Sequence, residues 1–489
     1  MEREDLANLT RRSILGTSMG LGAIAAAELL GGAKSLAKDG AAPPVGDAGP
    51  DLGKLATGQF PARAKRVIDI HMKGAVSQVD TFDYKPTVIK LHGTEIPASV
   101  KGTAKVSAMS NAQSSFPVMG PIAPYKQYGQ CGRWVSDLMP HTGAIADDLC
   151  FVHSIWTPQV NHDPADILLH TGFQLAGRPS GGAWVNYALG TDNSNLPAFI
   201  VMKSQFQSAG VGATQATWSA GFLPSNHQGV EFRSGNEPVL YVANPDGMDR
   251  AERRSQMDFI DDVARTQYQV AGDPEILSKI ASYEMAYRMQ DSVPEVTDLS
   301  DEPAYILDMY GPQVHVPGTF ARNCLLTRRL IERGVKYINL IQVGWDHHVA
   351  LARRHPGDCW AVDQPSAALV TDLKQRGLLD DTLVTFKGEF GRTVYSQGQG
   401  GITPNSGRDH HGGNFTMWMA GGGVKAGSAY GRTDDFSYNV VENPVEVHDL
   451  NATMLYLLGI DHKQLTFHYQ GRDFRLTDTA GKVIQGVLA

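Results

Sequence analysis

Residues 382–427 read TLVTFKGEFGRTVYSQGQGGITPNSGRDHHGGNFTMWMAGGGVKAG. The stretch begins with an apolar run, breaks at Gly388 into a loop rich in Gly, Asn and Ser, and resumes as a second apolar run at 415–420 before three glycines. Each apolar run is typical of a buried strand. Polar residues at the ends of buried strands lie where open α/β sheets place their sites. The stretch therefore predicts two core strands with a functional loop between them.

The loop between these strands carries side chains that bind metals. They are Glu389, Asp409, His410 and His411, accompanied by Arg392 and Arg408. Carboxylates and imidazoles together suit a borderline divalent metal such as Zn or Mn. A single histidine would be explained more simply as part of a solvated loop. Four such residues beside two core strands favour a metal site.

The rest of the chain alternates between strand-like and helix-like segments. Further strands are expected at 66–72, 147–155, 198–203 and 336–343, and amphipathic helices at 319–332, 363–376 and 447–458. This alternation predicts an α/β fold with a mainly parallel sheet covered on both faces. The charged segments 249–271 and 274–290 predict two more helices, which form scaffold or a small helical insertion near 245–292.

Two further strands carry candidate ligands. The strand at 66–72 holds Asp69 and His71 at alternate positions, so both side chains lie on one face. Asp69 is a candidate metal ligand, and a structural polar residue is an equally good interpretation. Asp346 and His348 follow the strand at 336–343, where a D-x-H loop can bring both side chains to one ion.

A third candidate group precedes a predicted helix. Asn161, His162 and Asp163 come directly before Pro164, and Gly172 is placed to end the helix. A helix N-terminus that follows a strand is a natural anion site. These residues are therefore candidates for contact with a substrate, and capping of the helix alone is the alternative.

The first residues are not expected to belong to the fold. The twin arginine in residues 10–16 (TRRSILG) precedes a small, apolar run, and Ala-Lys-Ser-Leu-Ala follows at 33–37. This resembles a Tat signal, although an uncleaved amphipathic helix is the alternative. We expect a signal peptide at 1–37, a linker at 38–59 and one domain at 60–489. The expected location is the periplasm or the exterior, with the Tat translocase as a partner during export.

Composition excludes several classes of protein. A net charge of -8 gives no electrostatic reason to expect a nucleic-acid partner. Beyond the signal, no stretch has the roughly 18 apolar residues that a membrane span needs. Four singly spaced cysteines do not form a metal knuckle, whereas one or two disulfides remain an option for an exported chain.

Several segments together resemble one family. VIDIHMKGAVSQVDTFDYKP, DDLCFVHSIWTPQVNHDPA with its closing TG, GWDHH, GEFGRT, GRDHH, MAGGGVKAG and HDLNATMLYLLGID follow one another as in the domain of unknown function 1501 (DUF1501) family. The resemblance covers about residues 65–473. It implies a Tat-exported, sulfatase-like branch of the alkaline phosphatase superfamily, and hence a three-layer α/β/α sandwich.

The resemblance also implies where ligands and nucleophile should lie. It places metal ligands at Asp69, at Asp346 and His348, at Glu389, and at His410 or His411. Two positions depart from the superfamily pattern. Phe390 stands where a ligand His is expected, and His162 stands where sulfatases carry a Cys or Ser nucleophile. His162 is then a metal ligand, a general base or a nucleophile.

These expectations lead to three functional hypotheses. The first is an exported hydrolase of phosphate or sulfate esters, in small molecules or polysaccharides, with one or two divalent ions (Zn, Mn, Ca or Mg). In this hypothesis His162, Asn161 and Asp163 face the substrate, and Arg392 or Arg408 binds the anion. The second is a non-catalytic protein that binds a sulfated polysaccharide or a cell-surface partner. The third is a structural exported protein whose histidines stabilise loops.

Overall fold

The computed structural model describes residues 59–489 apart from 103–106, 108, 206–211, 234–237 and 240–241. The expected signal at 1–37 lies outside the described residues, as does the expected linker except for Gln59. Within the described residues, no helix has both the length and the apolar character needed to cross a bilayer. None of the four cysteines, all of which are described, forms a disulfide.

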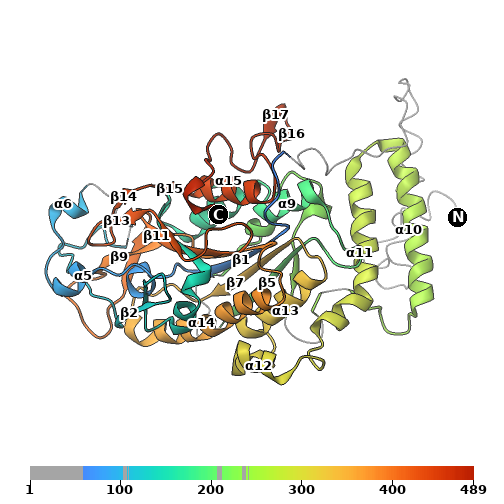
Figure 1. Ribbon diagram of the computed structural model, residues 1–489. Coiled ribbons are helices and arrows are strands. Elements are labelled where there is room, and N and C mark those ends of the chain that lie inside the picture. Colours follow the sequence, from blue (N-terminus) through green and yellow to red (C-terminus); the bar gives the residue numbers. More distant parts are fainter. Residues whose placement is uncertain (1–58, 103–106, 108, 206–211, 234–237, 240–241) are drawn as a thin grey trace, which may run out of the picture.

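A nine-stranded sheet forms the centre of the molecule (Figure 1). Its strands are β1 (Arg66–Lys73), β4 (Leu149–Trp156), β5 (Phe199–Gln205), β6 (Val230–Phe232), β7 (Tyr337–Val343), β8 (Thr382–Lys387), β11 (Phe415–Ala420), β12 (Ser428–Tyr430) and β15 (Val445–Glu446). The order is β12-β4-β11-β8-β1-β7-β5-β6, with β15 beside β4. Only β11 runs antiparallel to its neighbours, β4 and β8. The expected mainly parallel sheet is confirmed.

Helices cover both faces of this sheet (Figure 1). One face carries α8 (His162–Thr171), α9 (Gly181–Leu189) and α15 (Val447–Leu457), and the other carries α13 (Phe320–Glu332) and α14 (Leu351–Gln375). The central strand β1 divides its apolar residues between the faces, since Ile68 and Ile70 share a core cluster with α13 and Val67 shares the other with α9. The predicted three-layer α/β/α sandwich is confirmed.

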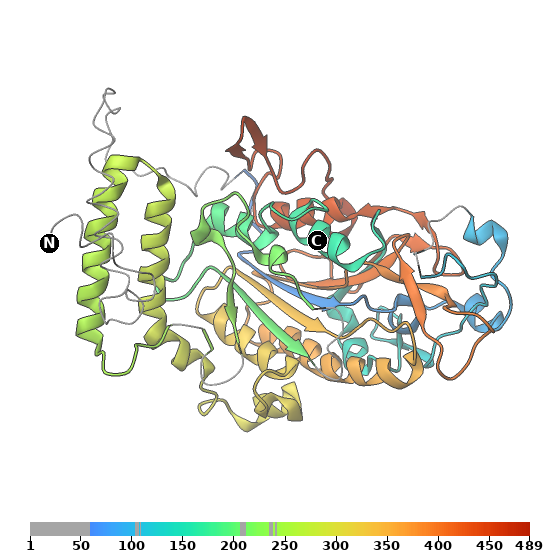
Figure 2. The same cartoon turned by 180° about the vertical axis from the view of Figure 1, so that it is seen from behind.

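The two charged helices expected after residue 245 are present. They are α10 (Arg250–Ala271) and α11 (Pro274–Thr297), and they project together from one end of the sheet (Figure 2). A capping box between Asp249 and Glu252 begins α10. The second helix continues past residue 290 because Val293 and Val296 are buried in the core cluster shared with α13.

Shorter elements surround the sandwich. They are α4 (Gln78–Thr81), α5 (Pro86–Lys90), α6 (Ala98–Lys101), β2 (Tyr125–Tyr128), β3 (Arg133–Ser136), α7 (Pro140–Ala144), α12 (Ala304–Tyr310), β13 (Arg432–Thr433), β14 (Val440–Glu442), β16 (Phe467–Tyr469) and β17 (Arg472–Phe474). The elements α5 and α6 lie at the end of the sheet opposite to α10 and α11 (Figures 1 and 2).

Two expectations about local structure were wrong. The helix expected from residue 363 begins at Leu351, and it contains Pro356 and Pro365. The segment expected to be a loop contains an antiparallel ribbon of β9 (Gly391–Ser396) and β10 (Arg408–His411). Pairing in this ribbon joins polar residues such as Arg392 and His410, so it leaves no apolar alternation to reveal a strand.

Candidate metal centre

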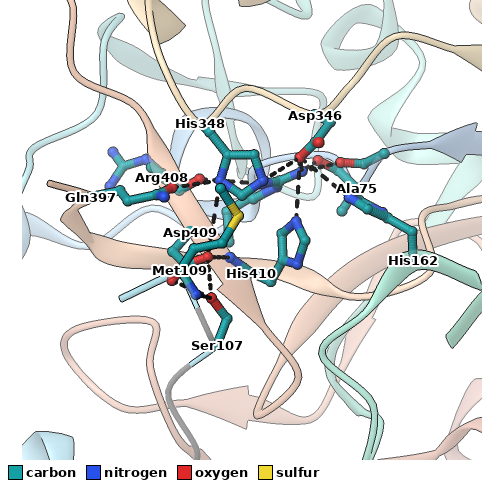
Figure 3. A network of polar contacts seen from close by, with 12 residues as sticks. Ala75, Ser107, Met109, His162, Asp346, His348, Gln397, Arg408, Asp409 and His410 are labelled. Carbon is teal, nitrogen blue, oxygen red and sulfur yellow. Dashed lines mark hydrogen bonds and ion pairs between the residues drawn. The ribbon is translucent and has the colours of Figure 1, made fainter. Parts of the chain in front are cut away.

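Four side chains from separate parts of the chain meet beyond the ends of the central strands. Asp346 and His348 follow β7, His410 lies on β10, and His162 is the first residue of α8. One ligand atom from each lies within 4.8 Å of the others. Figure 3 shows the three rings turned toward the Asp346 carboxylate. We call His162, Asp346, His348 and His410 the outer cluster.

The Nε2 atoms of the three rings converge on one oxygen. Asp346 Oδ1 lies 2.9 Å from His348 Nε2 and 3.3 Å from the Nε2 atoms of His162 and His410. Metal–ligand bonds of about 2.0–2.1 Å put neighbouring donor atoms about 2.9 Å apart in an octahedron and about 3.3 Å apart in a tetrahedron. The three distances from Asp346 Oδ1 therefore fit donors around a single small ion.

Each ring is held through its other nitrogen. His162 Nδ1 lies 2.6 Å from Glu389 Oε1, His348 Nδ1 lies 2.5 Å from Gln397 Oε1, and His410 Nδ1 lies 2.7 Å from the Val160 carbonyl oxygen. An N–H donated from Nδ1 leaves the lone pair of Nε2 free to face the shared carboxylate. Outer partners of this kind fix ring and tautomer in proteins that bind metals through histidine.

The donor set also fits a divalent ion chemically. Three imidazoles and one carboxylate suit Zn or Mn better than Ca or Mg, which prefer oxygen ligands. Among the described residues, His162 Nε2 is buried without a hydrogen-bond partner, as expected of an atom that awaits a ligand.

The electrostatics keep Asp346 ionised. Burial works to raise the pKa of Asp346, but the three imidazoles and Arg392 hold that pKa well below its usual range. Burial likewise works to lower the pKa of His162, and the carboxylates of Asp346 and Glu389 outweigh it, so the pKa of His162 is raised. Burial lowers the pKa of His410. The cluster thus has one firmly negative oxygen amid nitrogen donors.

Arg392, which was expected to bind an anion, donates its hydrogen bonds to groups within the protein. Its Nη2 donates to Asp346 Oδ1 at 2.6 Å and to the Gly74 carbonyl, and its Nη1 donates to the Arg408 carbonyl at 3.2 Å. The guanidinium is only 1% exposed. Arg392 is therefore placed to orient Asp346 rather than to meet a substrate.

The guanidinium of Arg408 likewise donates its hydrogen bonds to groups within the protein. Its Nε and Nη2 donate to the two carboxylate oxygens of Asp80 at 2.7 and 3.1 Å, and its remaining bonds go to backbone carbonyls. Because the pair is fully buried, the expected role of Arg408 in anion binding is not supported by its position.

Glu389 stands behind His162 instead of in the outer cluster. Its carboxylate accepts from the Gly74 N–H at 3.0 Å besides meeting His162. Burial works to raise the pKa of Glu389, but His162 and then Lys73 lower it to about 2. Phe390, found where the resemblance called for a histidine, packs against His162 and His410 with ring centroids 5.0 and 4.6 Å away. It supplies an apolar wall beneath the two imidazoles.

Two other expected ligands lie outside the outer cluster. Asp409 accepts hydrogen bonds from Ser107 at 2.6 Å, from Ser110 and from the His410 backbone N–H, and its Oδ1 is 4.0 Å from His348 Nδ1. His411 stacks on Tyr438 and places Nε2 2.6 Å from its carbonyl oxygen. Successive strand residues point to opposite faces, so His410 and His411 cannot both face the cluster.

Asp69 also lies apart from the outer cluster. Its carboxylate meets the Lys387 ammonium and accepts from Thr385 Oγ1 at 2.8 Å and Tyr337 Oη at 3.1 Å. Burial works to raise the pKa of Asp69, and Lys387 overcomes it, so the pKa is well below its usual range. The expectation that Asp69 belongs with the ligands Asp346 and His348 is not met, because it lies deeper, in the body of β1.

The start of α8 is open to solvent. Asn161 is the N-cap residue and is exposed, and its side chain makes no capping hydrogen bond in this described turn. The side chain of Asp163 is 70% exposed. Both residues therefore lie beside His162 at the solvent side, where the sequence-based hypothesis put the substrate.

Sequence reasoning missed several residues that shape this site. Gln397 and the Val160 carbonyl hold two rings, and no sequence pattern identifies either. By contrast, Asp166 and His170 follow His162 at four-residue intervals along α8, and that spacing is visible in the sequence.

Comparisons with known proteins come from both sequence and structure. A family model described as protein of unknown function (DUF1501) matches residues 64–488. No curated protein matches the chain.

Similar solved structures include the protein Ps i-CgsB, at 12% identity over 82% of this chain and 74% of that chain, with a TM-score of 0.36. PsFucS1 sulfatase from Pseudoalteromonas sp. matches at 14% identity over 81% and 68%, with a TM-score of 0.34. The C-terminal periplasmic domain of EcEptC from Escherichia coli, solved with Zn, matches at 8% identity over 87% and 96%, with a TM-score of 0.34. Likenesses this distant establish neither an activity nor a substrate.

Proposed function

Since the chain belongs to the DUF1501 family of proteins of unknown function, its activity has to be inferred from the site, and we propose that it is a metal-dependent hydrolase of phosphate or sulfate esters. The observation that carries this proposal is the convergence of three imidazole Nε2 atoms on Asp346 Oδ1, with each Nδ1 held by an outer partner. The imidazole-rich donor set favours Zn or Mn.

Asp346, His348 and His410 are the ligands in this proposal. A catalytic centre has three protein ligands and keeps a further position open. A bound ion supplies Lewis acidity, which polarises an ester oxygen and makes water a stronger nucleophile. These ligand side chains are between 7% and 19% exposed, so the cluster can be reached from solvent.

His162 and Glu389 would then work as a pair. Glu389 fixes the ring through Nδ1 at 2.6 Å, so Nε2 is the atom free to take a proton from water or return one to the leaving group. The carboxylates of Asp346 and Glu389 raise the pKa of His162, which favours the protonated form that can return a proton to the leaving group. No protein nucleophile is needed, which accommodates the departure at this position.

The start of α8 offers a binding site for the ester's anionic group. Its first-turn N–H groups carry no side-chain cap from Asn161, and helix N-termini favour negative charge. His162 begins this helix, so an anion bound there lies next to the outer cluster. This assigns to backbone N–H groups the role that the sequence suggested for Arg392 or Arg408.

A second candidate function is favoured by the position of His162, which offers a ligand atom within 4.8 Å of those of Asp346, His348 and His410. If His162 binds the ion as a fourth ligand, the centre has four protein donors, as closed structural sites do. The protein would then be a non-catalytic binding protein, such as one for a sulfated polysaccharide.

Replacement of His162 separates the two functions. In the hydrolase, His162→Gln keeps the metal and loses turnover by about 10²–10⁴-fold, the usual contribution of acid–base catalysis. In the binding protein, His162→Gln weakens metal binding, and the wild type shows no turnover. The assay is release of phosphate or sulfate from 4-nitrophenyl esters with Zn or Mn, alongside metal analysis. Turnover that persists in a metal-free protein would overturn the hydrolase proposal.

We also propose export through the Tat translocase to the periplasm or exterior. The twin arginine at 11–12 and the small residues at 33–37 support it. Replacing both arginines by lysine should leave the precursor in the cytoplasm, which cell fractionation detects. A twin-lysine chain that is still exported would contradict the Tat route.

A further inference from the structure

A second group of ionisable side chains lies beneath the outer cluster, between a helix and the central strand. On β1, alternate residues share the face covered by α8, and on α8, residues four apart share a stripe. We call the facing residues the polar seam: Asp69, His71 and Lys73 from β1, and Asp166 and His170 from α8. His162 begins the same helical stripe at the outer cluster, so the seam continues that cluster into the core.

The polar seam is buried as deeply as the hydrophobic core. Each of its residues is at most 5% exposed. A central parallel strand normally packs apolar side chains against the helix that covers it. Burying an ionised group costs several kcal/mol even after relaxation of the protein. The ion pairs of Lys73 with Asp166 and of Lys387 with Asp69 offset part of this cost, and the imidazole nitrogens of the seam that lack partners are left to be explained.

Three donors of the seam are near one another but are not hydrogen-bonded to one another. His71, Asp166 and His170 each offer a ligand atom within 4.8 Å of the other two, and His71 Nε2 is 2.9 Å from Asp166 Oδ1. Yet among the described residues, both nitrogens of His71, Asp166 Oδ1 and His170 Nε2 lack a hydrogen-bond partner. Close donors with poor mutual alignment are expected when their lone pairs point at a common third atom.

In two of these three ligands, Asp166 and His170, the remaining atom is already held by the protein. Asp166 Oδ2 is 2.9 Å from the Lys73 ammonium, which leaves Oδ1 available. His170 Nδ1 lies 2.9 Å from the Asp166 carbonyl oxygen, which leaves Nε2 available. Asp166 and His170 thus repeat the arrangement of the outer cluster, in which one atom is held by the protein and the other is presented.

A proton is the simplest alternative occupant. Burial works to lower the pKa of His170, but Asp166 and then Asp69 outweigh it, and the pKa is raised. An imidazolium at His170 would add to the positive charge that Lys73 already places beside Asp166. It would not provide partners for the nitrogens of His71, however, so it explains only part of the seam.

We propose that the polar seam binds a divalent ion of the zinc type through His71, Asp166 and His170, at a site separate from the outer cluster. Two imidazoles and one carboxylate form a donor set suited to Zn, Mn or Fe. The ion joins β1 to α8, and it thereby fixes the helix that carries His162. Glu389 links the two sites, since Oε1 meets His162 and Oε2 lies 3.8 Å from His71 Nε2.

The site is tested by counting metal in a protein whose outer cluster has been disabled. Full-length wild type and the double variant Asp346→Asn/His348→Gln are stripped with chelator, reloaded with Co²⁺, dialysed and analysed for cobalt per chain. We expect two equivalents in the wild type and one in the double variant. Adding His71→Gln to the double variant should remove the remaining equivalent.

A control variant and three contradicting results complete this test. His355→Gln replaces a buried histidine outside both sites and should leave two equivalents bound. A folded double variant without cobalt overturns the proposal, as does cobalt that survives His71→Gln. Should the triple variant not fold, His170→Gln in the wild type decides, with one equivalent expected and two contradicting the site. A lack of ester hydrolysis leaves these counts unaffected, so the proposed activity and the seam site can fail independently.

Discussion

The adjacent residues His347 and His348 belong to two different groups of imidazoles, and histidine has opposite roles in the two groups. His348 faces the outer cluster, where its Nε2 is 2.9 Å from the ionised carboxylate of Asp346. The adjacent His347 faces inward, with Nε2 2.9 Å from Asp358 Oδ2 and Nδ1 3.3 Å from Nδ1 of His355. Both groups contain histidines and a carboxylate, so residue type alone does not distinguish them.

The pKa of the carboxyl group distinguishes the two groups. Burial raises the pKa of Asp358 to about 6, whereas the pKa of Asp346 is held far below its usual range by imidazoles and Arg392. Burial lowers the pKa values of His347 and His355 to about 3. In this inner group of His347, His355 and Asp358 the imidazoles are therefore neutral at pH 7, and the carboxyl of Asp358 takes up a proton just below neutral pH, whereas Asp346 stays ionised. The outer cluster keeps a negative oxygen among free lone pairs, as a cation requires.

The largest expected effect is at Asp346. Asp346→Asn keeps the shape of the side chain but removes the negative charge, so we expect the ion of the outer cluster to be lost and ester hydrolysis to become undetectable. The matched change in the inner group, Asp358→Asn, should leave both unchanged. Metal analysis and turnover of the two variants measure the contrast, and equal losses in both would remove the distinction between the groups.

The next effect comes from the carboxylate behind His162. Glu389→Gln removes the charge that holds His162 Nδ1, so ester hydrolysis should fall by about 10–100-fold while the ion stays bound, because the acid–base ring loses its orientation. Release of phosphate or sulfate measures the turnover, and metal analysis checks that the ion is retained. Turnover within twofold of the wild type would show that Glu389 does not position the ring.

The buried imidazole of His355 in the inner group should make the free energy of unfolding depend on pH. The folded-state pKa of His355 is lowered to about 3, so between about pH 6.5 and 3 the unfolded chain takes up a proton that the folded chain does not. Stability contributed by neutral His355 is therefore present above pH 6.5 and lost as the pH falls. Between pH 7 and 5 the wild type should lose about 2 kcal/mol more than His355→Gln. Urea unfolding at both pH values tests this, and parallel losses would contradict it.

The smallest effect is expected at Asn161. Its exposed side chain makes no capping bond within the described first turn of α8, so Asn161→Ala should change the free energy of unfolding by less than about 0.5 kcal/mol. Bound metal should not change. A loss of more than about 1 kcal/mol, the usual cost of removing an N-cap, would show that the side chain caps the helix in solution.

Much of the fold could be predicted from the sequence because the central strands are apolar runs bounded by glycines and polar loops. The strand at 336–343 and the helix at 319–332 match β7 and α13 to within a residue. The ribbon of β9 and β10 could not be predicted from local sequence. Its residues Arg392 and Arg408 are buried in ion pairs with Asp346 and Asp80, which come from distant segments.

The site was predictable only in part for the same reason. Asp346, His348 and His410 were expected from their positions at strand ends. The sequence could not show which histidine of each adjacent pair faces inward, because that depends on partners such as Tyr438 and Asp358. It also could not place Asp409, whose carboxylate accepts a hydrogen bond from Ser107, or Asp69, whose carboxylate pairs with the Lys387 ammonium. The periodicities behind the polar seam were present in the sequence, but their facing one another became visible only when α8 was placed over β1.

The most direct test of the outer cluster is X-ray absorption at the metal edge of protein reloaded with zinc, in a His71→Gln background that disables the seam. The account predicts one zinc per chain with two or three imidazole ligands at about 2.0 Å, and loss of that signal in Asp346→Asn. Zinc without imidazole ligands, or zinc retained in full by Asp346→Asn, would contradict the assignment of this cluster as a metal centre.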